Sequence, residues 1–200
     1  MDNERVVPVA GLTPSHLDQI AALEHECVTA EDIRLKLEWN VLRRRRGDHP
    51  EDFLWYRDGR LIGFAGLYIF RPDLAEICGM VHPDARCQGV FRHLVTTAAA
   101  HAQARGVDEI LLVSDQRSAS AAGFLQHLGL KRAHSEYLMR RPPAPIEVID
   151  DRVSLRQAGP ADAAFVTAIT HAAFGPSDTP PPPADPAAVN DPKRPVFVIG

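Results

Sequence analysis

The stretch Val81-His82-Pro83-Asp84-Ala85-Arg86-Cys87-Gln88-Gly89-Val90-Phe91 joins an apolar run to an amphipathic segment. We interpret it as a strand that leads through a short turn into the start of a helix. Unpaired backbone N–H groups gather at such a point, and the helix dipole adds partial positive charge, so the turn suits a phosphate or pyrophosphate. Gly89 lets the backbone approach a ligand closely. The stretch therefore predicts a protein that handles a phosphate-bearing cofactor.

The residues before this stretch predict a short strand and two helices. The strand covers 7–9, and Pro14 begins a helix that extends to about Cys27. Thr29 is a suitable N-cap for the second helix. Its apolar residues recur at i, i+4 and i+8, and it ends in the four arginines at 43–46.

A hairpin and a helix–strand–helix order frame the opening stretch. The dipeptide Asp58-Gly59 is the strongest short hairpin signal, and it separates two apolar segments. Ser118 is a suitable N-cap for a later helix that Gly129 ends. The expected elements are strands at 53–57, 61–70 and 74–82, a helix at 89–104, a strand at 109–114, a helix at 118–128 and a closing strand or strand pair at 131–141. This order predicts an α/β (α+β) fold with a mixed, largely antiparallel sheet, one βαβ crossover and flanking helices.

The composition is that of an ordinary soluble globular protein. Hydrophobic residues make up 45% of the 200 residues, charged residues 24%, and the net charge is −4. That charge gives no reason to expect a nucleic acid or a membrane surface as a partner. No apolar run approaches the roughly 20 residues that span a bilayer, and no signal-peptide pattern is present. The 3 cysteines have neither disulfide-framework nor metal-ligand spacing. We therefore expect a cytoplasmic protein with no metal site.

A proline-rich stretch divides the chain into a first domain at 1–142, a linker at 143–152 and a remainder at 153–200. Val153 and His171 repeat Val7 and His25 in similar surroundings, at one constant offset of 146 residues. A constant offset of this length suggests tandem copies. About 50 residues cannot build the same core alone. We expect the remainder to be the start of an incomplete second domain within a longer protein, or else a C-terminal extension.

Two motifs, in this element order, resemble those of the GNAT superfamily of acetyl-CoA-dependent N-acyltransferases. The family's strand–loop–helix motif is written Q/R-x-x-G-x-G/A, and residues 86–91 (RCQGVF) match it after a typical Val81-His82-Pro83. Residues 121–130 (AAGFLQHLGL) are similar to the family's second motif, A..FYeklGF. The resemblance covers about 6–141.

This resemblance implies acetyl-CoA as co-substrate and places it along the opening stretch. The loop N–H groups would hold its pyrophosphate. The strand through Met80 and Val81 would splay from its neighbour so that the pantetheine arm pairs with the strand edge. Ser118 stands where many members carry an Asn near the cofactor. The implied cofactor-binding residues are Met80, Val81, Arg86, Cys87, Gln88, Gly89, Val90, Phe91 and Ser118.

The sequence departs from the family pattern in three places. Phe91 replaces the last Gly/Ala of the loop, and Ser118 replaces the Asn. Leu125 occupies the position of the Tyr that often protonates the leaving thiolate, and a leucine has no proton to give. Another group or bulk water would then supply the proton, or the domain would bind an acyl-CoA without efficient turnover.

Amine acylation needs a base for the ammonium group and a donor that polarises the thioester carbonyl. The N–H near Val81 is the candidate donor. Glu76, Asp115 and Tyr137 are the candidate catalytic side chains. Strand alternation puts Glu76 on the face opposite Val81, where it could simply be exposed or hairpin-paired. Asp115 points toward the usual substrate cleft or forms a turn with Gln116, and Tyr137 on the closing strand faces the substrate or packs.

Three functions remain open. The leading one is transfer of an acetyl or acyl group from acetyl-CoA to a primary amine of a small molecule or peptide, by a homodimer or beside a second GNAT domain of the same chain. The alternative is a non-catalytic acyl-CoA-binding or structural domain that supports a second catalytic domain. The third is nucleic-acid binding by 43–46. A solvated helix end is the alternative for those arginines, and no aromatic residues interleave with them.

Overall fold

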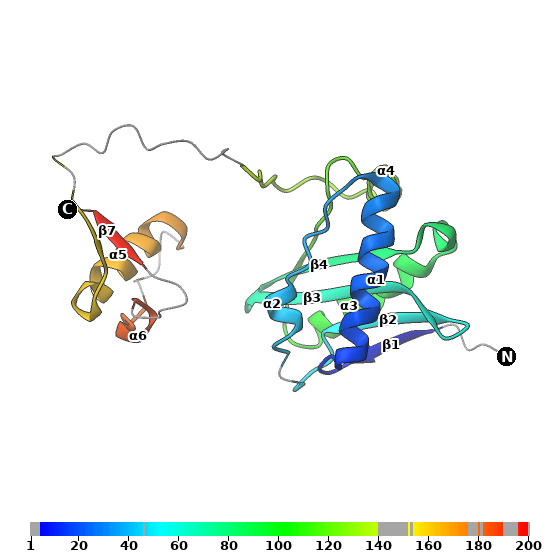
Figure 1. Ribbon diagram of the computed structural model, residues 1–200, viewed down its shortest axis with the longest axis horizontal. Helices are drawn as coiled ribbons and strands as arrows, with labels where there is room; N and C mark the ends of the chain where they lie inside the picture. Colours follow the sequence, from blue (N-terminus) through cyan, green and yellow to red (C-terminus); the bar gives the residue numbers. More distant parts are fainter. Residues whose placement is uncertain are drawn as a thin grey trace. The chain divides into compact units, whose positions relative to one another are not determined.

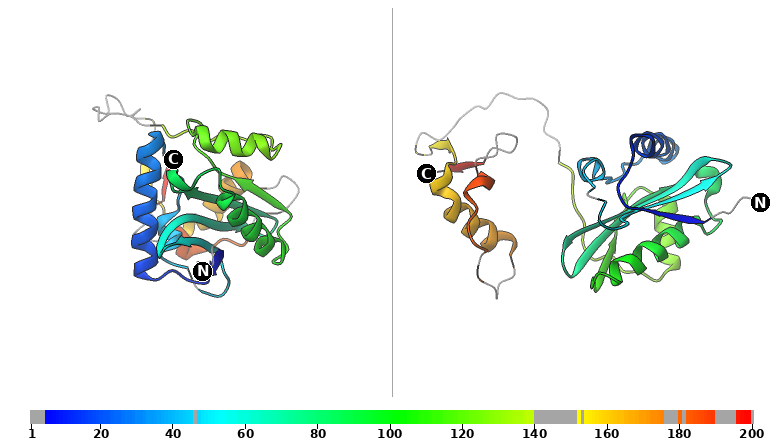
Figure 2. Two further views of the ribbon diagram at one scale, coloured as in Figure 1. Left: turned by 90° about the vertical axis from the view of Figure 1, so that its right-hand side faces the viewer. Right: turned by 90° about the horizontal axis from the view of Figure 1, so that it is seen from below.

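The computed structural model describes residues 5–45, 47–139, 152, 154–175, 180, 182–189 and 196–199. They form two compact units that divide between Glu136 and Tyr137. The first unit is a five-stranded sheet with helices against both faces (Figures 1 and 2). This is the mixed, largely antiparallel architecture that the sequence predicts.

The strands of the first unit follow each other through the sheet in chain order, β1-β2-β3-β4-β5. Neighbours are antiparallel except β4 and β5, which are parallel because α3 crosses between them. Asp58 and Gly59 both have positive φ, as the predicted hairpin turn requires. The elements are β1 (Val6–Val9), α1 (Pro14–Glu31), α2 (Trp39–Leu42), β2 (Asp52–Arg57), β3 (Arg60–Arg71), β4 (Leu74–Val81), a 3-10 turn (Pro83–Ala85), α3 (Val90–Gln103), β5 (Glu109–Leu112) and α4 (Ala119–His127).

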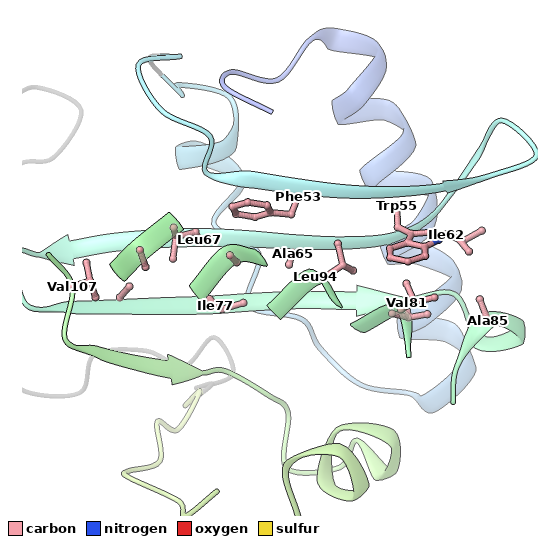
Figure 3. Close-up of a cluster of buried hydrophobic side chains, with 14 residues drawn as sticks. Phe53, Trp55, Ile62, Ala65, Leu67, Ile77, Val81, Ala85, Leu94 and Val107 are labelled. Atoms are coloured by element: carbon pink, nitrogen blue, oxygen red, sulfur yellow. The ribbon is translucent and has the colours of Figure 1, made fainter. Parts of the chain in front are cut away.

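Two apolar layers hold these elements together, one on each face of the sheet. Helix α3 turns a stripe of residues, Leu94 and Ala98 among them, toward Phe53, Ile77 and Val81 of the strands (Figure 3). The other face is covered by α1 and α2, and its buried residues are Ile20, Leu23, Cys27, Leu37, Leu42, Leu54, Leu61, Phe64, Tyr68, Cys78 and Met80. The end of β4 therefore contributes side chains to both layers.

The predicted second helix over about 30–46 is wrong. Helix α1 continues to Glu31, Asp32 ends it with a left-handed backbone (φ 49°), and α2 is a single turn. Between them the segment 32–38 carries no helix or strand. Ile33 and Leu37, spaced by four, are both buried, and Leu35 between them is partly buried and packs on the same apolar layer. An alternation of period 2 belongs to an extended chain, so the i, i+4 spacing was misread as helical.

The predicted closing strand is also not formed in its described part, 131–139. Large side chains there, such as Leu138 and Met139, are exposed. A strand is stabilised by a hydrogen-bonded neighbour and a buried face, and this segment has no ladder with β5. Arg140 and Arg141 of that prediction lie outside the described residues.

Two arginines of the run at 43–46 contact other parts of the fold. The Arg45 guanidinium is buried, with Nε 3.1 Å from Asp52 Oδ2 and NH1 2.6 Å from Glu51 Oε2. It also donates to the Leu67 carbonyl (2.8 Å) and lies over the Tyr68 ring. Arg43 lies over the Trp39 ring. The structure thus gives two of these arginines intramolecular partners, which favours neither a nucleic-acid surface nor a fully solvated helix end.

The second unit is small. Its two-stranded sheet pairs β6 (Leu155–Gln157) with β7 (Phe197–Ile199), and between them lie a 3-10 turn (Pro160–Asp162), α5 (Ala163–Phe174) and α6 (Pro186–Val189). The predicted linker at 143–152 lies outside the described residues except for Arg152. Of the helices in the described ranges, none has the length and apolarity to cross a bilayer.

Candidate functional site

A cleft begins where β4 and β5 part. Their parallel ladder runs from Leu74 opposite Glu109 to Ile77 opposite Leu112, and the Val113 N–H still donates to the Ile77 carbonyl (3.0 Å). Beyond Ile77, β4 pairs with β3 alone, through Val81. Because alternate residues of a strand turn their backbone groups to the same side, the N–H groups of Gly79 and Val81 face the side that β5 has left. The divergence that the resemblance implied is therefore present.

A cavity of about 670 Å³ fills this cleft. Its walls are the end of β4, the turn into α3, the start of α4 and the end of α1 with the segment after it. Most of the predicted cofactor-binding residues line it, namely Met80, Val81, Arg86, Cys87, Gly89, Val90, Phe91 and Ser118. Gln88 does not, because its amide donates to the Asp84 carbonyl (3.0 Å) and accepts from Arg57 (3.0 Å). One cavity thus brings together residues that the sequence predicted to share a ligand.

The turn into α3 exposes backbone donors. Cys87 and Gly89 have positive φ (59° and 83°), which folds the loop back on itself. Gly89 is the N-cap of α3, and no side chain caps the first turn of that helix. The turn lines the cavity at the N-terminus of α3, where the unpaired N–H groups of a first helical turn and the positive end of the helix dipole suit an anion.

Gly79 lies in the wall of the cavity at a position that has no room for a side chain. A Cβ at this position would lie 2.4 Å from the Phe64 carbonyl oxygen and 2.9 Å from the Phe91 ring. No side chain fits there without moving backbone. The sequence reasoning did not single out Gly79, because nothing in the chain alone indicates which backbone approaches it.

Glu31 is a second residue of the site that sequence reasoning missed. It is the last residue of α1, yet its carboxylate accepts from the Ser118 hydroxyl (2.8 Å) and the Ser120 N–H (3.1 Å) and pairs with Arg86 (3.1 Å). Burial alone would raise its pKa, but these hydrogen bonds and Arg86 together hold the pKa of Glu31 below its usual value. Because Glu31 was expected in the first turn of a different helix, no sequence signal pointed to the cleft.

A comparison with known families identifies the fold. The family described as Acetyltransferase (GNAT) matches residues 16–130, which include every cavity residue. The chain belongs to the acetyltransferase (GNAT) family.

Individual relatives agree with this membership. A mycothiol acetyltransferase of Thermomonospora curvata is 31% identical over 166 residues, which are 80% of this chain and 54% of the relative. The chain thus spans about half the length of that curated relative.

Two solved N-acetyltransferase structures share the fold. A GCN5-related N-acetyltransferase from Sphaerobacter thermophilus matches with a TM-score of 0.69 at 22% identity. The match covers 94% of this chain and 64% of that protein's chain. The ribosomal-protein-S18-alanine N-acetyltransferase of Escherichia coli matches with a TM-score of 0.51 at 20% identity. This match covers 66% of this chain and 79% of that protein's chain.

Of the three predicted catalytic side chains of this GNAT domain, Asp115 lies at the cavity. It accepts from the Arg34 N–H (2.9 Å) and the Arg117 N–H (2.8 Å), and it pairs with the Arg117 guanidinium (3.2 Å). The bonds from the Arg117 side chain and from these N–H groups lower the pKa of Asp115 to about 2. A carboxylate held in this way is a weak proton acceptor. It also links the segment after α1, through Arg34, to the segment after β5, through Arg117.

Glu76 and Tyr137 do not line the cavity. The predicted alternation of β4 holds, since Cys78 and Met80 belong to the apolar layer opposite that of Val81. Glu76 shares their parity and is 3.3 Å from the Lys36 ammonium group. Tyr137 is 81% exposed and is the first residue of the second unit.

Two other residues of interest at the cavity, Leu125 and Cys27, offer neither an acid nor a ready nucleophile. Leu125 lines it, as the second motif implied. Cys27 also lines it, but burial raises the pKa of its thiol to about 11, and the thiol donates to the Val81 carbonyl (3.4 Å). Cys78 is buried and Cys87 exposed. Within the described ranges, no group of three or more His, Cys, Asp or Glu side chains is arranged to hold a metal ion.

Proposed function

We propose that this chain transfers an acetyl or acyl group from acetyl-CoA to a primary amine. The observation that carries the proposal is the cavity of about 670 Å³, which opens at the divergence of β4 and β5 and ends at the uncapped first turn of α3. A cavity of this size is in the ordinary range for an organic ligand. Membership of the GNAT family supports the same activity.

The residues present fit coenzyme A. The N–H groups of the turn and of the first turn of α3 would hold the pyrophosphate. The cleft-facing N–H groups of Gly79 and Val81 would pair with the pantetheine arm, and that of Val81 would polarise the acyl carbonyl. Acetyl-CoA supplies the acyl group as an activated thioester. The chain itself supplies binding, orientation and a donor aimed at the oxygen where negative charge develops.

Two of the three predicted proton-transfer groups are held in ion pairs. Glu76 is paired with Lys36, and Asp115 is ionised and paired with Arg117, so both contacts favour structural roles. Tyr137 stays a prediction. We assign the amine's deprotonation to neither Glu76 nor Asp115, and we expect bulk water to protonate the leaving thiolate, because Leu125 cannot.

A second candidate function is favoured by two observations. Leu125 lines the cavity where the resemblance implies a proton donor. The second unit also contains a helix start like that of the first unit. Pro14 and Pro160 each begin a helical segment, and the N–H of the preceding N-cap residue donates to the side chain three residues further along the chain. We propose that 153–200 starts a second GNAT-like copy. The first unit would then be an acyl-CoA-binding or structural partner of that copy.

The acceptor and setting are proposed at the level of class. One relative is a mycothiol acetyltransferase, and one similar structure is a ribosomal-protein-S18-alanine N-acetyltransferase. Because these acceptors differ, we propose for this chain no more than an amine on a small molecule or peptide. We also propose a cytoplasmic location and either a homodimer or pairing with a second domain of the same chain.

Calorimetry with acetyl-CoA tests the binding step. The wild-type chain should release or absorb heat on titration, and Gly89→Trp should not, because Gly89 has φ 83° and stands at the α3 N-terminus. No heat with the wild-type chain would sink the proposal. Release of free thiol from acetyl-CoA in the presence of an amine panel then separates the two candidates, since turnover by this chain excludes a purely structural role.

A further inference from the structure

The two walls of the cleft have no backbone ladder between them. One wall is the end of β4 with the turn that follows, and the other is the start of α4, which comes after β5. Strand pairing between β4 and β5 stops at Ile77 opposite Leu112. The width of the cleft beyond that point must therefore be set by side chains.

Glu31 provides a side-chain connection between these walls. Its Oε2 accepts from the hydroxyls of Ser118 (2.8 Å) and Ser120 (3.1 Å), and its Oε1 accepts from the Ser120 N–H (3.1 Å). These groups belong to the N-terminus of α4. On the opposite wall, Oε1 lies 3.1 Å from NH1 of Arg86. The carboxylate is 14% exposed, so solvent screens these contacts little.

Arg86 continues the connection to β4. Its Nε donates to the Val81 carbonyl (3.2 Å), which faces the cleft and also accepts from the Cys27 thiol (3.4 Å). A chain of polar contacts therefore runs from α4 through Glu31 and Arg86 to the last residue of β4. We call these four residues, Glu31, Arg86, Ser118 and Ser120, the Glu31 clasp, and all four line the cavity.

We propose that Glu31 is a positioning residue that fixes the separation of β4 and α4 and so shapes the cleft for the pantetheine arm of the cofactor. The inference rests on the proposed function, because it needs acetyl-CoA to bind in this cavity. A role as general base is disfavoured by the contacts, since each carboxylate oxygen already accepts from two donors. The donors proposed for the phosphates at Gly89 are backbone N–H groups, and the Glu31 carboxylate contacts other groups, so we expect these donors to keep their place without it.

The test compares two ligands of the full chain by calorimetry, acetyl-CoA and 3′-phospho-ADP, the nucleotide half of coenzyme A. Glu31→Ala should weaken acetyl-CoA binding by about tenfold, which is about 1.4 kcal/mol. The same variant should leave the affinity for 3′-phospho-ADP within about twofold, as expected for independent sites. Glu31→Gln, which keeps the length and one acceptor, should recover part of the loss.

Ser120→Ala is a second, milder change to the same contacts, because it removes only the hydroxyl that donates to Glu31. It removes one donor from an exposed position, and the double variant Glu31→Ala/Ser120→Ala should bind acetyl-CoA no more weakly than Glu31→Ala, because coupled contacts are not additive. Glu26→Ala is the matched control. Glu26 lies on the same helix and contacts Arg60 (2.6 Å) and His82 (3.0 Å). Neither it nor these partners line the cavity, so both affinities should stay at the wild-type values.

The outcomes separate this inference from the proposed function. If the wild-type chain binds neither ligand, the proposed function fails. If the wild-type chain binds both and Glu31→Ala leaves acetyl-CoA binding unchanged, or weakens both ligands equally, the positioning role is wrong. A selective loss of acetyl-CoA affinity, with Glu26→Ala unaffected, supports it.

Discussion

At the scale of single residues, Gly79 shows how closely the backbones pack beneath the cleft. We expect Gly79→Ala to destabilise the protein by about 1–3 kcal/mol, because its methyl group would overlap the Phe64 carbonyl. Gly123→Ala is the matched control in α4, where a Cβ meets nothing within 4 Å. It should stabilise the protein by about 0.5–1 kcal/mol through helix propensity. Urea unfolding midpoints of the two variants measure the difference, and equal midpoints would contradict this account.

Asp52 predicts a pH dependence of stability at the same scale. Burial raises the pKa of this carboxyl from 3.8 to about 6, although Arg45 opposes the shift. The folded state then binds a proton more readily than the unfolded state, so this group's contribution to the free energy of unfolding falls as the pH rises from about 4 to about 6 and is constant above. Asp52→Asn should lack that part of the slope. Unfolding titrations between these pH values test it, and an unchanged slope in the variant would rule it out.

At the scale of elements, the connection between α2 and β2 depends on one buried ion pair. Arg45→Met leaves Asp52 buried without its cation, which should destabilise the protein by about 3–5 kcal/mol. Arg44→Met, at an exposed position next to it, should change stability by less than about 0.5 kcal/mol. Thermal unfolding of both variants measures the effect.

Replacing both partners of that pair is the diagnostic control. Arg45→Met/Asp52→Leu should recover much of the loss, because two apolar side chains need no charge compensation. A double variant as unstable as Arg45→Met alone would show that the guanidinium acts through its other contacts, such as the Leu67 carbonyl.

Elements with strong local signals were predicted well. The Asp58-Gly59 hairpin, the helix that starts after Gly89 and the Ser118 cap all appear where the sequence places them. These signals are local because a turn, a positive φ or a cap bonds residues only a few positions apart. The segment 32–38 was mispredicted because its bonds are long-range, such as those from Arg34 to Asp115 and from Glu38 to Tyr68.

At the scale of the whole molecule, the cavity belongs to one unit. All its lining residues lie between Cys27 and His127, and the division between units falls after Glu136. A fragment of residues 1–139 should therefore bind acetyl-CoA with the affinity of the full chain, within about twofold. Calorimetry on both proteins measures this, and loss of binding in a folded fragment would place part of the site in the second unit.

The sequence by itself determined the family, the turn into α3 and the order of the elements from β2 to α4. Each depends on residues that are neighbours along the chain, such as 86–91 and 121–130. Only the tertiary structure decided which distant groups meet, including Glu31 with Ser118 and Arg86, Gly79 with Phe64, and Arg45 with Asp52. The physical reason is that these groups meet only when β4 diverges from β5 and α1 packs across the sheet. Neither arrangement leaves a repeating pattern of residues along the chain, so the sequence does not indicate it.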